Sequence, residues 1–161
     1  MLLKNLIKNP PQTVKDLNIK GLALNSNDVK KGFIFFAIKG SKSNGENFIN
    51  KAIKKGASIV VCSNECKYQS IKTHIIKTKN VKKYLSEITA KYYRSKPKNI
   101  IAVTGTNGKT SVADFFFQIL NKNKLKVASI GTLGIRYKNK FIKTSLTSPD
   151  IITLHKNLEM L

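Results

Sequence analysis

The chain is poor in acidic residues, arginine and cysteine, and each shortage excludes a class of protein. Eight aspartates and glutamates stand against 30 lysines and arginines, which gives a formal net charge of +22 over 161 residues. With only Cys62 and Cys66, a scaffold built from disulfides is excluded. No apolar run approaches the ~18 residues of a membrane-spanning helix. The N-terminus lacks the apolar segment and cleavage site of a secretory signal, so we expect a cytoplasmic protein.

The positive charge comes almost entirely from lysine, because only Arg94 and Arg136 are arginines. Arginine is the preferred residue for binding phosphate through two parallel hydrogen bonds and for hydrogen bonding to the edges of nucleic-acid bases. The lysines are spread along the chain, and together with the many isoleucines and asparagines they indicate an A/T-rich gene. We therefore expect no specific nucleic-acid partner, only weak adhesion to polyanions at low salt.

The chain divides into two parts at the polar segment Ser95–Lys98. The first part, residues 1–96, alternates short apolar runs with helical periodicity, which is typical of an α/β domain. Strands are expected over residues 21–24, 32–38, 58–62 and 74–76, and helices over residues 48–53 and 81–92. The phenylalanines of residues 33–36 are interpreted as strand core and not as a stacking surface for nucleic acid.

The second part, residues 97–161, begins with an apolar run typical of a buried strand, residues 99–103. A glycine-rich turn, a helix with an apolar stripe over residues 112–120, a strand over 127–130 and a hairpin over 135–142 are expected next. Asp150 is expected to cap a last helix, residues 151–161. Two strands and a hairpin are few for a nucleotide-binding sheet, so we expect the chain to be the front of a longer protein.

The most informative segment is Thr104-Gly105-Thr106-Asn107-Gly108-Lys109-Thr110-Ser111, named here the glycine loop. It stands between an expected strand and an expected helix, which is the context of a phosphate-binding loop. Glycines permit close approach of the backbone to an anion, and free N–H groups at a helix start attract phosphate. Lys109 offers a charge for the β- and γ-phosphates and Thr110 a hydroxyl for Mg²⁺. Val103 stands where the strict motif has glycine, so this is a shortened variant; the plain alternative is a tight turn capped by threonine.

The sequence TGTNGKTS is similar to the ATP-binding signature of the Mur ligases, ATP-dependent amide-forming enzymes of peptidoglycan precursor synthesis. Residues 24–26, 28–37 and 52–61, with Gly40 and Gly45, resemble the UDP-binding domain of that family. The segment Thr147-Ser148-Pro149-Asp150 is similar to the Thr-Thr-Pro-Asp segment of the branch that adds the third peptide residue. The resemblance covers nearly the whole chain.

The resemblance implies an α/β fold: a UDP-sugar-binding domain over residues 1–96, then the start of a P-loop-type ATPase domain over residues 97–161. It also implies roles for single residues. Leu24 and Ser26 would lie at the uridine end of the substrate, Ser41, Lys42 and Ser43 would contact the UDP group, and Thr147 and Ser148 would contact the muramoyl-dipeptide. The residues implied to hold ATP are Gly105, Thr106, Asn107, Gly108, Lys109, Thr110 and Ser111, with Lys109 catalytic and Thr110 on Mg²⁺.

Three positions depart from the family pattern. Asn25 replaces the aspartate usual beside the serine, which predicts a weaker polar contact. Ser148 replaces the second threonine and keeps its hydroxyl. Leu146 stands where some relatives have asparagine, which predicts a lost or backbone-only contact.

The activity implied is transfer of phosphate from ATP to the carboxylate of UDP-N-acetylmuramoyl-dipeptide, followed by attack of a diamino acid on the acyl phosphate. Meso-diaminopimelate is the expected amino acid, with lysine left open. We expect a monomer without a membrane span, and no activity from these 161 residues alone. Two alternatives remain: a related Mur ligase that adds the D-Ala-D-Ala dipeptide, and a non-catalytic module that holds UDP-sugar or ATP.

Overall fold

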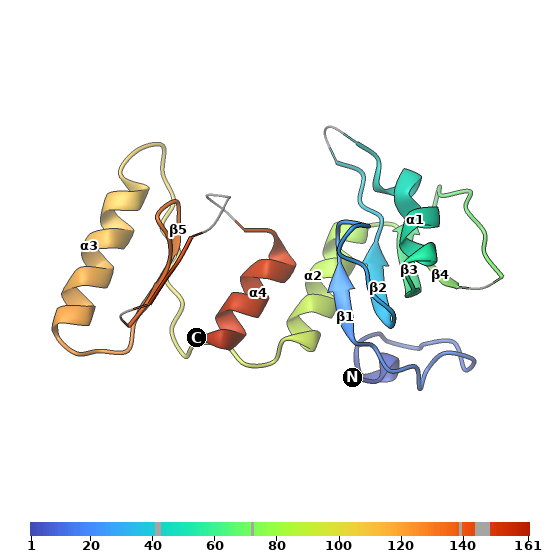
Figure 1. Cartoon of the computed structure of the whole chain (residues 1–161), viewed down its shortest axis with the longest axis horizontal. Coiled ribbons are helices and arrows are strands. Elements are labelled where there is room, and N and C mark those ends of the chain that lie inside the picture. The colour runs from blue at the N-terminus through green and yellow to red at the C-terminus, as the bar shows by residue number, and fades with distance from the viewer. Residues whose placement is uncertain (41–42, 72, 139, 144–148) are drawn as a thin grey trace. The chain divides into compact units, whose positions relative to one another are not determined.

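The computed structural model describes residues 1–40, 43–71, 73–138, 140–143 and 149–161. Its contacts divide the chain into two compact units, Met1–Arg94 and Ser95–Leu161 (Figure 1). The sequence places the boundary at Lys96, within the same polar segment. Within the described ranges, no helix combines the length and the apolar character that crossing a bilayer requires.

The first unit is built on a four-stranded parallel sheet in the order β1-β2-β3-β4. The expected α/β class is confirmed, the structure adds that the strands are parallel, and each strand begins and ends within two residues of its expected bounds. In the centre of the sheet Phe35 lies opposite Val60, and Phe36 lies opposite Val61. The strands are β1 (Gly21–Ala23), β2 (Phe33–Phe36), β3 (Ala57–Ser63) and β4 (His74–Thr78).

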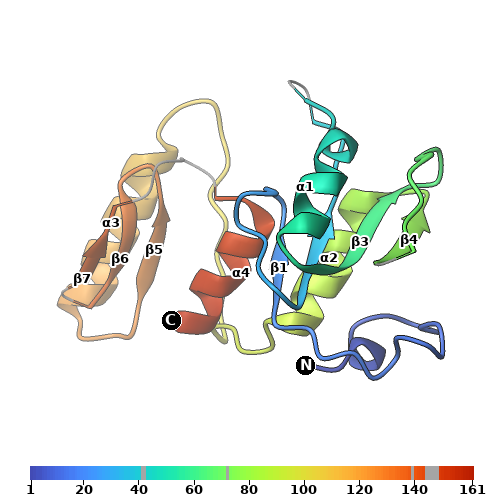
Figure 2. The ribbon, with the colours of Figure 1, turned by 45° about the vertical axis from the view of Figure 1, so that its right-hand side comes forward.

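Two helices cover the two faces of this sheet (Figure 2). The 3-10 turn η2 (Gly45–Phe48) leads directly into α1 (Ile49–Lys54), and α2 (Val81–Tyr92) follows β4. The Asn80 side chain caps α2 by accepting the Lys83 N–H at 2.9 Å. Both faces of a parallel sheet are usually buried, so each face must be covered by other elements. The two helices together provide this cover.

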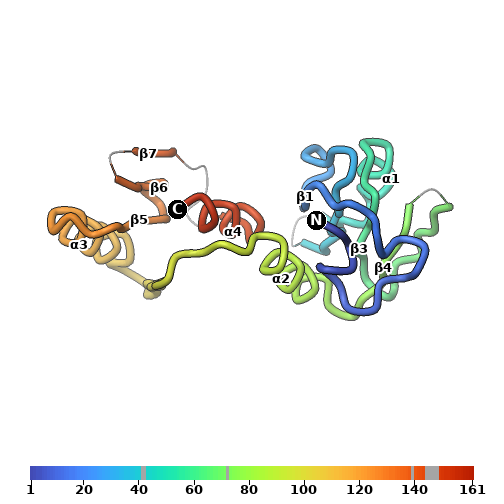
Figure 3. Tube along the Cα trace, turned by 90° about the horizontal axis from the view of Figure 1, so that it is seen from below, coloured from blue at the N-terminus to red at the C-terminus, as the bar shows by residue number. Residues whose placement is uncertain are grey.

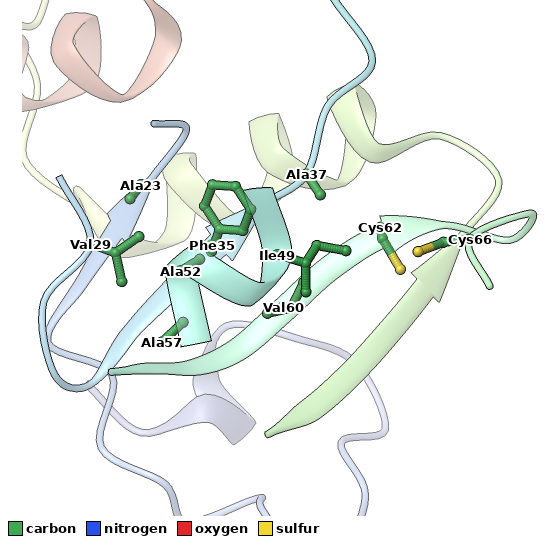
Figure 4. Close-up of a cluster of buried hydrophobic side chains, with 10 residues drawn as sticks. All are labelled: Ala23, Val29, Phe35, Ala37, Ile49, Ala52, Ala57, Val60, Cys62 and Cys66. Carbon is green, nitrogen blue, oxygen red and sulfur yellow. The ribbon is translucent and has the colours of Figure 1, made fainter. Parts of the chain in front are cut away.

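Successive side chains of β2 and β3 point to opposite faces of the sheet, so they face α1 and α2 in turn. Phe35, Val60 and Cys62 pack with Ile49 and Ala52 of α1 in one buried cluster (Figure 4). Their neighbours along the strands point to the opposite face; they are fully or almost fully buried as well, namely Ile34, Phe36, Ile59 and Val61. The interpretation of Phe35 and Phe36 as strand core is therefore confirmed.

The N-terminal segment, which Figure 3 traces in dark blue, closes the face on the α2 side. It contains the short turn η1 (Leu3–Asn5), and the Leu3 N–H donates to the Leu17 carbonyl at 2.9 Å. Lys91 of α2 donates to the Leu6 carbonyl at 3.0 Å. Leu3, Leu6 and Ile19 are buried, so the N-terminal segment contributes side chains to the core of this unit.

The second unit is an antiparallel three-stranded sheet in the order β5-β6-β7, with α3 packed against β5. Asp114 of α3 forms an ion pair with Arg136 of β6. The Arg136 guanidinium also lies 4.6 Å from the centroid of the Phe117 ring, and Phe117 is buried. The elements are α3 (Lys109–Lys122), β5 (Ala128–Gly131), β6 (Gly134–Tyr137), β7 (Lys140–Ile142) and α4 (Ile151–Met160).

One expectation for the second unit is wrong. Residues 99–103 form no strand, and Ile100 and Ile101 are 57% and 65% exposed. None of the described residues pairs with them, and a strand exists only where a neighbour takes its hydrogen bonds. The helix expected over residues 112–120 is present within α3. Its apolar stripe is exposed at Val112, Phe115, Phe116 and Ile119, because α3 meets β5 and β6 through its Asp114 and Phe117 side. Helical periodicity predicts which side chains form an apolar face, but it does not predict which element covers that face.

The expected cap of the last helix is confirmed. Asp150 Oδ1 accepts the N–H groups of Ile152 at 2.9 Å and Thr153 at 3.1 Å. Its second oxygen accepts the Thr153 hydroxyl at 2.7 Å. Three donors on one carboxylate fix the start of α4 where helix amides otherwise lack partners.

We expect Phe35→Ala to lower the free energy of unfolding of the first unit by about 3–5 kcal/mol, because it leaves a cavity in the centre of the sheet. The matched control is Phe48→Ala, since Phe48 is 41% exposed and Phe35 only 1%; its cost should stay below about 1 kcal/mol. Urea unfolding followed by circular dichroism measures both. Equal losses in the two variants would contradict the core assigned here.

We also expect the thiol of Cys62 to be unreactive in the folded chain. Burial raises its pKa to about 12, and a hydrogen bond with Cys66 adds to the shift. A raised thiol pKa favours the neutral form, so at pH 8 the thiolate fraction should be roughly 1,000-fold below that of the unfolded chain. Cys66→Ser leaves Cys62 as the single thiol. Rapid labelling of that variant by Ellman's reagent without urea would contradict the prediction.

Candidate functional site

The carboxyl ends of the four parallel strands meet at one edge of the first unit's sheet. Leu24 and Ser26 follow β1, and the loop that contains Ser43 follows β2. Asn64 follows β3, beside the end of β4 at Thr78. Ligands of parallel α/β sheets bind outside this edge. The fold therefore gathers Leu24, Ser26 and Ser43 at one edge, while Ser41 and Lys42 lie outside the described residues.

The turn after β1 is held by one of its own side chains and by a lysine at the end of α1. Asn25 Oδ1 accepts the Asn27 N–H at 2.8 Å, and Lys55 donates to the Asn27 carbonyl at 2.6 Å. Ser26 between them is buried. An asparagine oxygen makes this turn as well as an aspartate oxygen does, so the departure at Asn25 keeps the turn and removes only a charge.

The loop after β2, residues 38–45, is closed by main-chain hydrogen bonds and named here the β2 loop. The Gly45 N–H donates to the Ile38 carbonyl at 3.0 Å, and the Gly40 N–H donates to the Ser43 carbonyl at 2.9 Å. Lys39 and Asn44 form an antiparallel bridge. A side chain on Gly45 would lie 2.6 Å from the Ile38 carbonyl oxygen, so only glycine fits where the loop closes.

Glu46 is a residue of this edge that the sequence analysis missed. Its Oε1 accepts the Ser63 N–H at 3.2 Å and the Ser63 hydroxyl at 2.7 Å. Its own N–H donates to Asn44 Oδ1 at 3.0 Å. The Asn44-Gly45 pair signals the turn, but no sequence pattern connects Glu46 with a serine 17 positions away.

In the second unit the glycine loop leads directly into α3. Gly108 caps the helix with φ +76°, and no side chain caps the first-turn amides. A Cβ on Gly108 would meet nothing within 4 Å, so its role is the left-handed backbone and the open space in front of the helix. Uncapped amides at the start of a helix, here one of 14 residues, are a type of site at which anions bind in proteins.

Lys109 lies folded over the loop itself. Its ammonium donates to the Gly105 carbonyl and, at 3.2 Å, to the Thr106 carbonyl. Thr110 stands in the first helical turn, and both side chains are exposed. A bound phosphate would meet an ammonium already held at the loop. The hydroxyl of Thr110 suits Mg²⁺, which takes oxygen ligands and completes its shell with phosphates and water.

The other two predicted site residues, Thr147 and Ser148, lie outside the described residues. Among the residues that are described, no group of three or more histidines, cysteines, aspartates or glutamates could hold a metal ion.

Comparison with protein families gives two matches that together cover most of the chain. Residues 18–93 match the Mur ligase family, catalytic domain, and residues 103–161 match the Mur ligase middle domain. The division between the two matches falls in the same stretch as the division between the two structural units.

Several curated proteins are similar to the chain, all with the name UDP-N-acetylmuramoyl-L-alanyl-D-glutamate–2,6-diaminopimelate ligase. The Zymomonas mobilis protein is 41% identical over 139 residues, which are 86% of this chain and 28% of that protein. The Rickettsia prowazekii protein is 41% identical over 149 residues, 90% of this chain and 31% of that one. The Bradyrhizobium diazoefficiens protein is 38% identical over 162 residues, 99% and 33%. The chain thus spans about a third of the length of these relatives.

Solved structures share the fold. A structure of a ligase with that same name aligns with a TM-score of 0.81 over 99% of this chain and 33% of its own, at 24% identity. A MurF ligase from Thermotoga maritima in complex with ADP aligns with a TM-score of 0.54 over 70% of this chain and 25% of its own, at 28% identity.

We expect Gly45→Ala to open the β2 loop, because the new methyl group would collide with the Ile38 backbone. The free energy of unfolding should fall by about 1–3 kcal/mol. Gly131→Ala is the matched control, since a Cβ there meets nothing within 4 Å and should change stability by less than about 0.5 kcal/mol. Thermal unfolding of both variants measures the difference, and a Gly45 variant as stable as the control would contradict this geometry.

Proposed function

Because the chain belongs to the Mur ligase family, we propose that it forms part of a cytoplasmic ligase that joins 2,6-diaminopimelate to UDP-N-acetylmuramoyl-L-alanyl-D-glutamate. The observation that carries this proposal is the order of two features. A parallel sheet with a polar carboxyl edge comes first, and a glycine loop at a helix start follows. The choice of 2,6-diaminopimelate comes from the names of the similar proteins.

The first unit would bind the UDP end of the substrate at its carboxyl edge. Ser26 is buried in the turn after β1, and Ser43 belongs to the closed β2 loop. Together with Leu24, and with Ser41 and Lys42 of the same loop, they would supply the uridine and diphosphate contacts. The N–H groups and hydroxyls available here suit a neutral base and a phosphate better than a metal ion.

The glycine loop would bind ATP, which Mur ligases use. Residues 105–111 would surround the β- and γ-phosphates with main-chain N–H groups, and Lys109 would leave the loop carbonyls to neutralise phosphate charge. Mg²⁺, held in part by the Thr110 hydroxyl, would further neutralise the phosphates. Thr147 and Ser148 would contact the peptide end of the acceptor substrate.

The chemistry is activation of a carboxylate, because amide formation from a free acid is unfavourable in water. The carboxylate oxygen of the D-glutamyl residue attacks the γ-phosphorus of ATP, the bond to ADP breaks, and an acyl phosphate forms. The amine of 2,6-diaminopimelate then attacks the acyl carbon, and inorganic phosphate and a proton leave. Positioning and charge neutralisation dominate such a phosphoryl transfer, and this chain offers Lys109 for both.

Calorimetric titration of the chain with UDP-N-acetylmuramoyl-L-alanyl-D-glutamate tests the substrate. We expect binding to the dipeptide and to UDP itself, since the first unit would read the UDP end. The complete ligase, with ATP, the dipeptide substrate and 2,6-diaminopimelate, should release phosphate. Release that requires the tripeptide substrate and D-Ala-D-Ala would instead identify the related dipeptide-adding ligase, and no UDP binding by the chain would contradict the proposal.

We expect Lys109→Ala to weaken ATP binding about 10- to 100-fold, the loss typical of one charge-assisted contact. Lys122→Ala removes the same charge at the other end of α3 and should leave the affinity within about twofold. Titration of the complete ligase with a non-hydrolysable ATP analogue measures both dissociation constants. Equal affinities in the two variants would remove the phosphate-binding interpretation of the glycine loop.

A further inference from the structure

We propose that Glu46 is a positioning residue that fixes the β2 loop against the end of β3 and thereby sets the affinity of the first unit for the UDP-sugar. The inference rests on the proposed function, because it gives the loop a substrate to position. It adds a residue to which neither the sequence motifs nor the family resemblance gives a role.

The contacts of Glu46 join two neighbouring strand ends. One carboxylate oxygen takes both donors of Ser63, the N–H at 3.2 Å and the hydroxyl at 2.7 Å. Ser63 is the last residue of β3, and Glu46 lies one residue after the β2 loop closes. Hydrogen bonds to a charged acceptor are about twice as strong as neutral ones, so this pair is a strong side-chain link between Glu46 and the end of β3.

The link acts on the loop through a short series of hydrogen bonds. The Glu46 N–H donates to Asn44 Oδ1, and the adjacent Gly45 N–H donates to the Ile38 carbonyl. A carboxylate anchored on β3 therefore holds the closing end of the loop. Ser43 directly precedes Asn44, so its position depends on the same hydrogen bonds.

The negative charge of Glu46 is a second argument for a positioning role. Glu46 is one of only eight acidic residues in the chain, and a carboxylate near a diphosphate opposes binding by charge repulsion. An acidic residue that only filled space at this edge would therefore lower the affinity for the diphosphate. The partly buried link to Ser63, beside the buried Cys62 and Ile49, offsets that repulsion by ordering the loop.

The experiment compares Glu46→Ala, Glu46→Gln and Glu65→Ala in the whole chain. Glutamine keeps an oxygen that can accept both Ser63 donors but loses the charge. Glu65 is exposed and follows Ser63 by two positions, so its replacement removes the same charge near the same edge without touching the loop. Calorimetry gives the dissociation constant for UDP-N-acetylmuramoyl-L-alanyl-D-glutamate, and hydrogen exchange gives the protection of the Gly40 and Gly45 amides without ligand.

We expect Glu46→Ala to weaken substrate binding about tenfold or more, the loss of one charge-assisted hydrogen bond or two weaker ones. It should also speed exchange at Gly40 and Gly45 at least tenfold. Glu46→Gln should restore both values to within about threefold of the original chain. Glu65→Ala should leave exchange unchanged and bind as tightly as the original chain or tighter, because it only removes repulsion.

The outcomes separate this inference from the proposed function. If the original chain binds the substrate and Glu46→Ala binds it equally well, the role of Glu46 is overturned and the proposed function stands. Unchanged exchange at Gly40 and Gly45 in Glu46→Ala overturns it without reference to any ligand. If the original chain does not bind the substrate, the proposed function fails and the substrate role of Glu46 fails with it.

Discussion

Parallel pairing of β2 with β3 is the constraint on which the first unit depends. Both strands carry large apolar side chains on both faces, so each face must be covered, and two parallel strands can be joined only by a crossover. The turn η2 and helix α1 supply that crossover and cover one face; α2 and the N-terminal segment cover the other. Because all four strands then point the same way, their carboxyl ends and the polar residues that follow them gather at one edge, and we propose that this edge holds the ligand.

The second unit depends on a different interaction. Asp114 and Arg136 join α3 to β6, and the arginine also lies over Phe117. This is one of only two arginines in a chain rich in lysine; a planar guanidinium can pair and stack at once, which an ammonium cannot do as well. The helix so anchored presents its uncapped start and Gly108 at the glycine loop, where a phosphate would bind.

Both the α/β class and the glycine loop were within reach of sequence reasoning, because each depends on local patterns. Alternating and helical periodicity predicted β1 to β4 and α2, and Gly108 signals a left-handed backbone before a helix. The strand expected over residues 99–103 failed for the opposite reason: its residues favour a strand, but a strand needs a partner. The helix with the apolar stripe is present as α3, and periodicity alone did not decide that its stripe is exposed. The roles of Leu24, Ser26, Ser43 and Lys109 toward ligands stay predictions that rest on the family.

The sequence by itself determined the composition of the faces, the turn at Asn44-Gly45, the cap at Asp150 and the motif at residues 104–111, since each depends on residues a few positions apart. Only the tertiary structure decided which strand ends lie side by side and therefore that Glu46 meets Ser63, 17 positions along the chain. It also decided that Leu3, Leu6 and Ile19 of the N-terminal segment belong to the core and that Arg136 pairs with Asp114. Contacts between distant segments depend on strand order and register, and local residue preferences do not specify either.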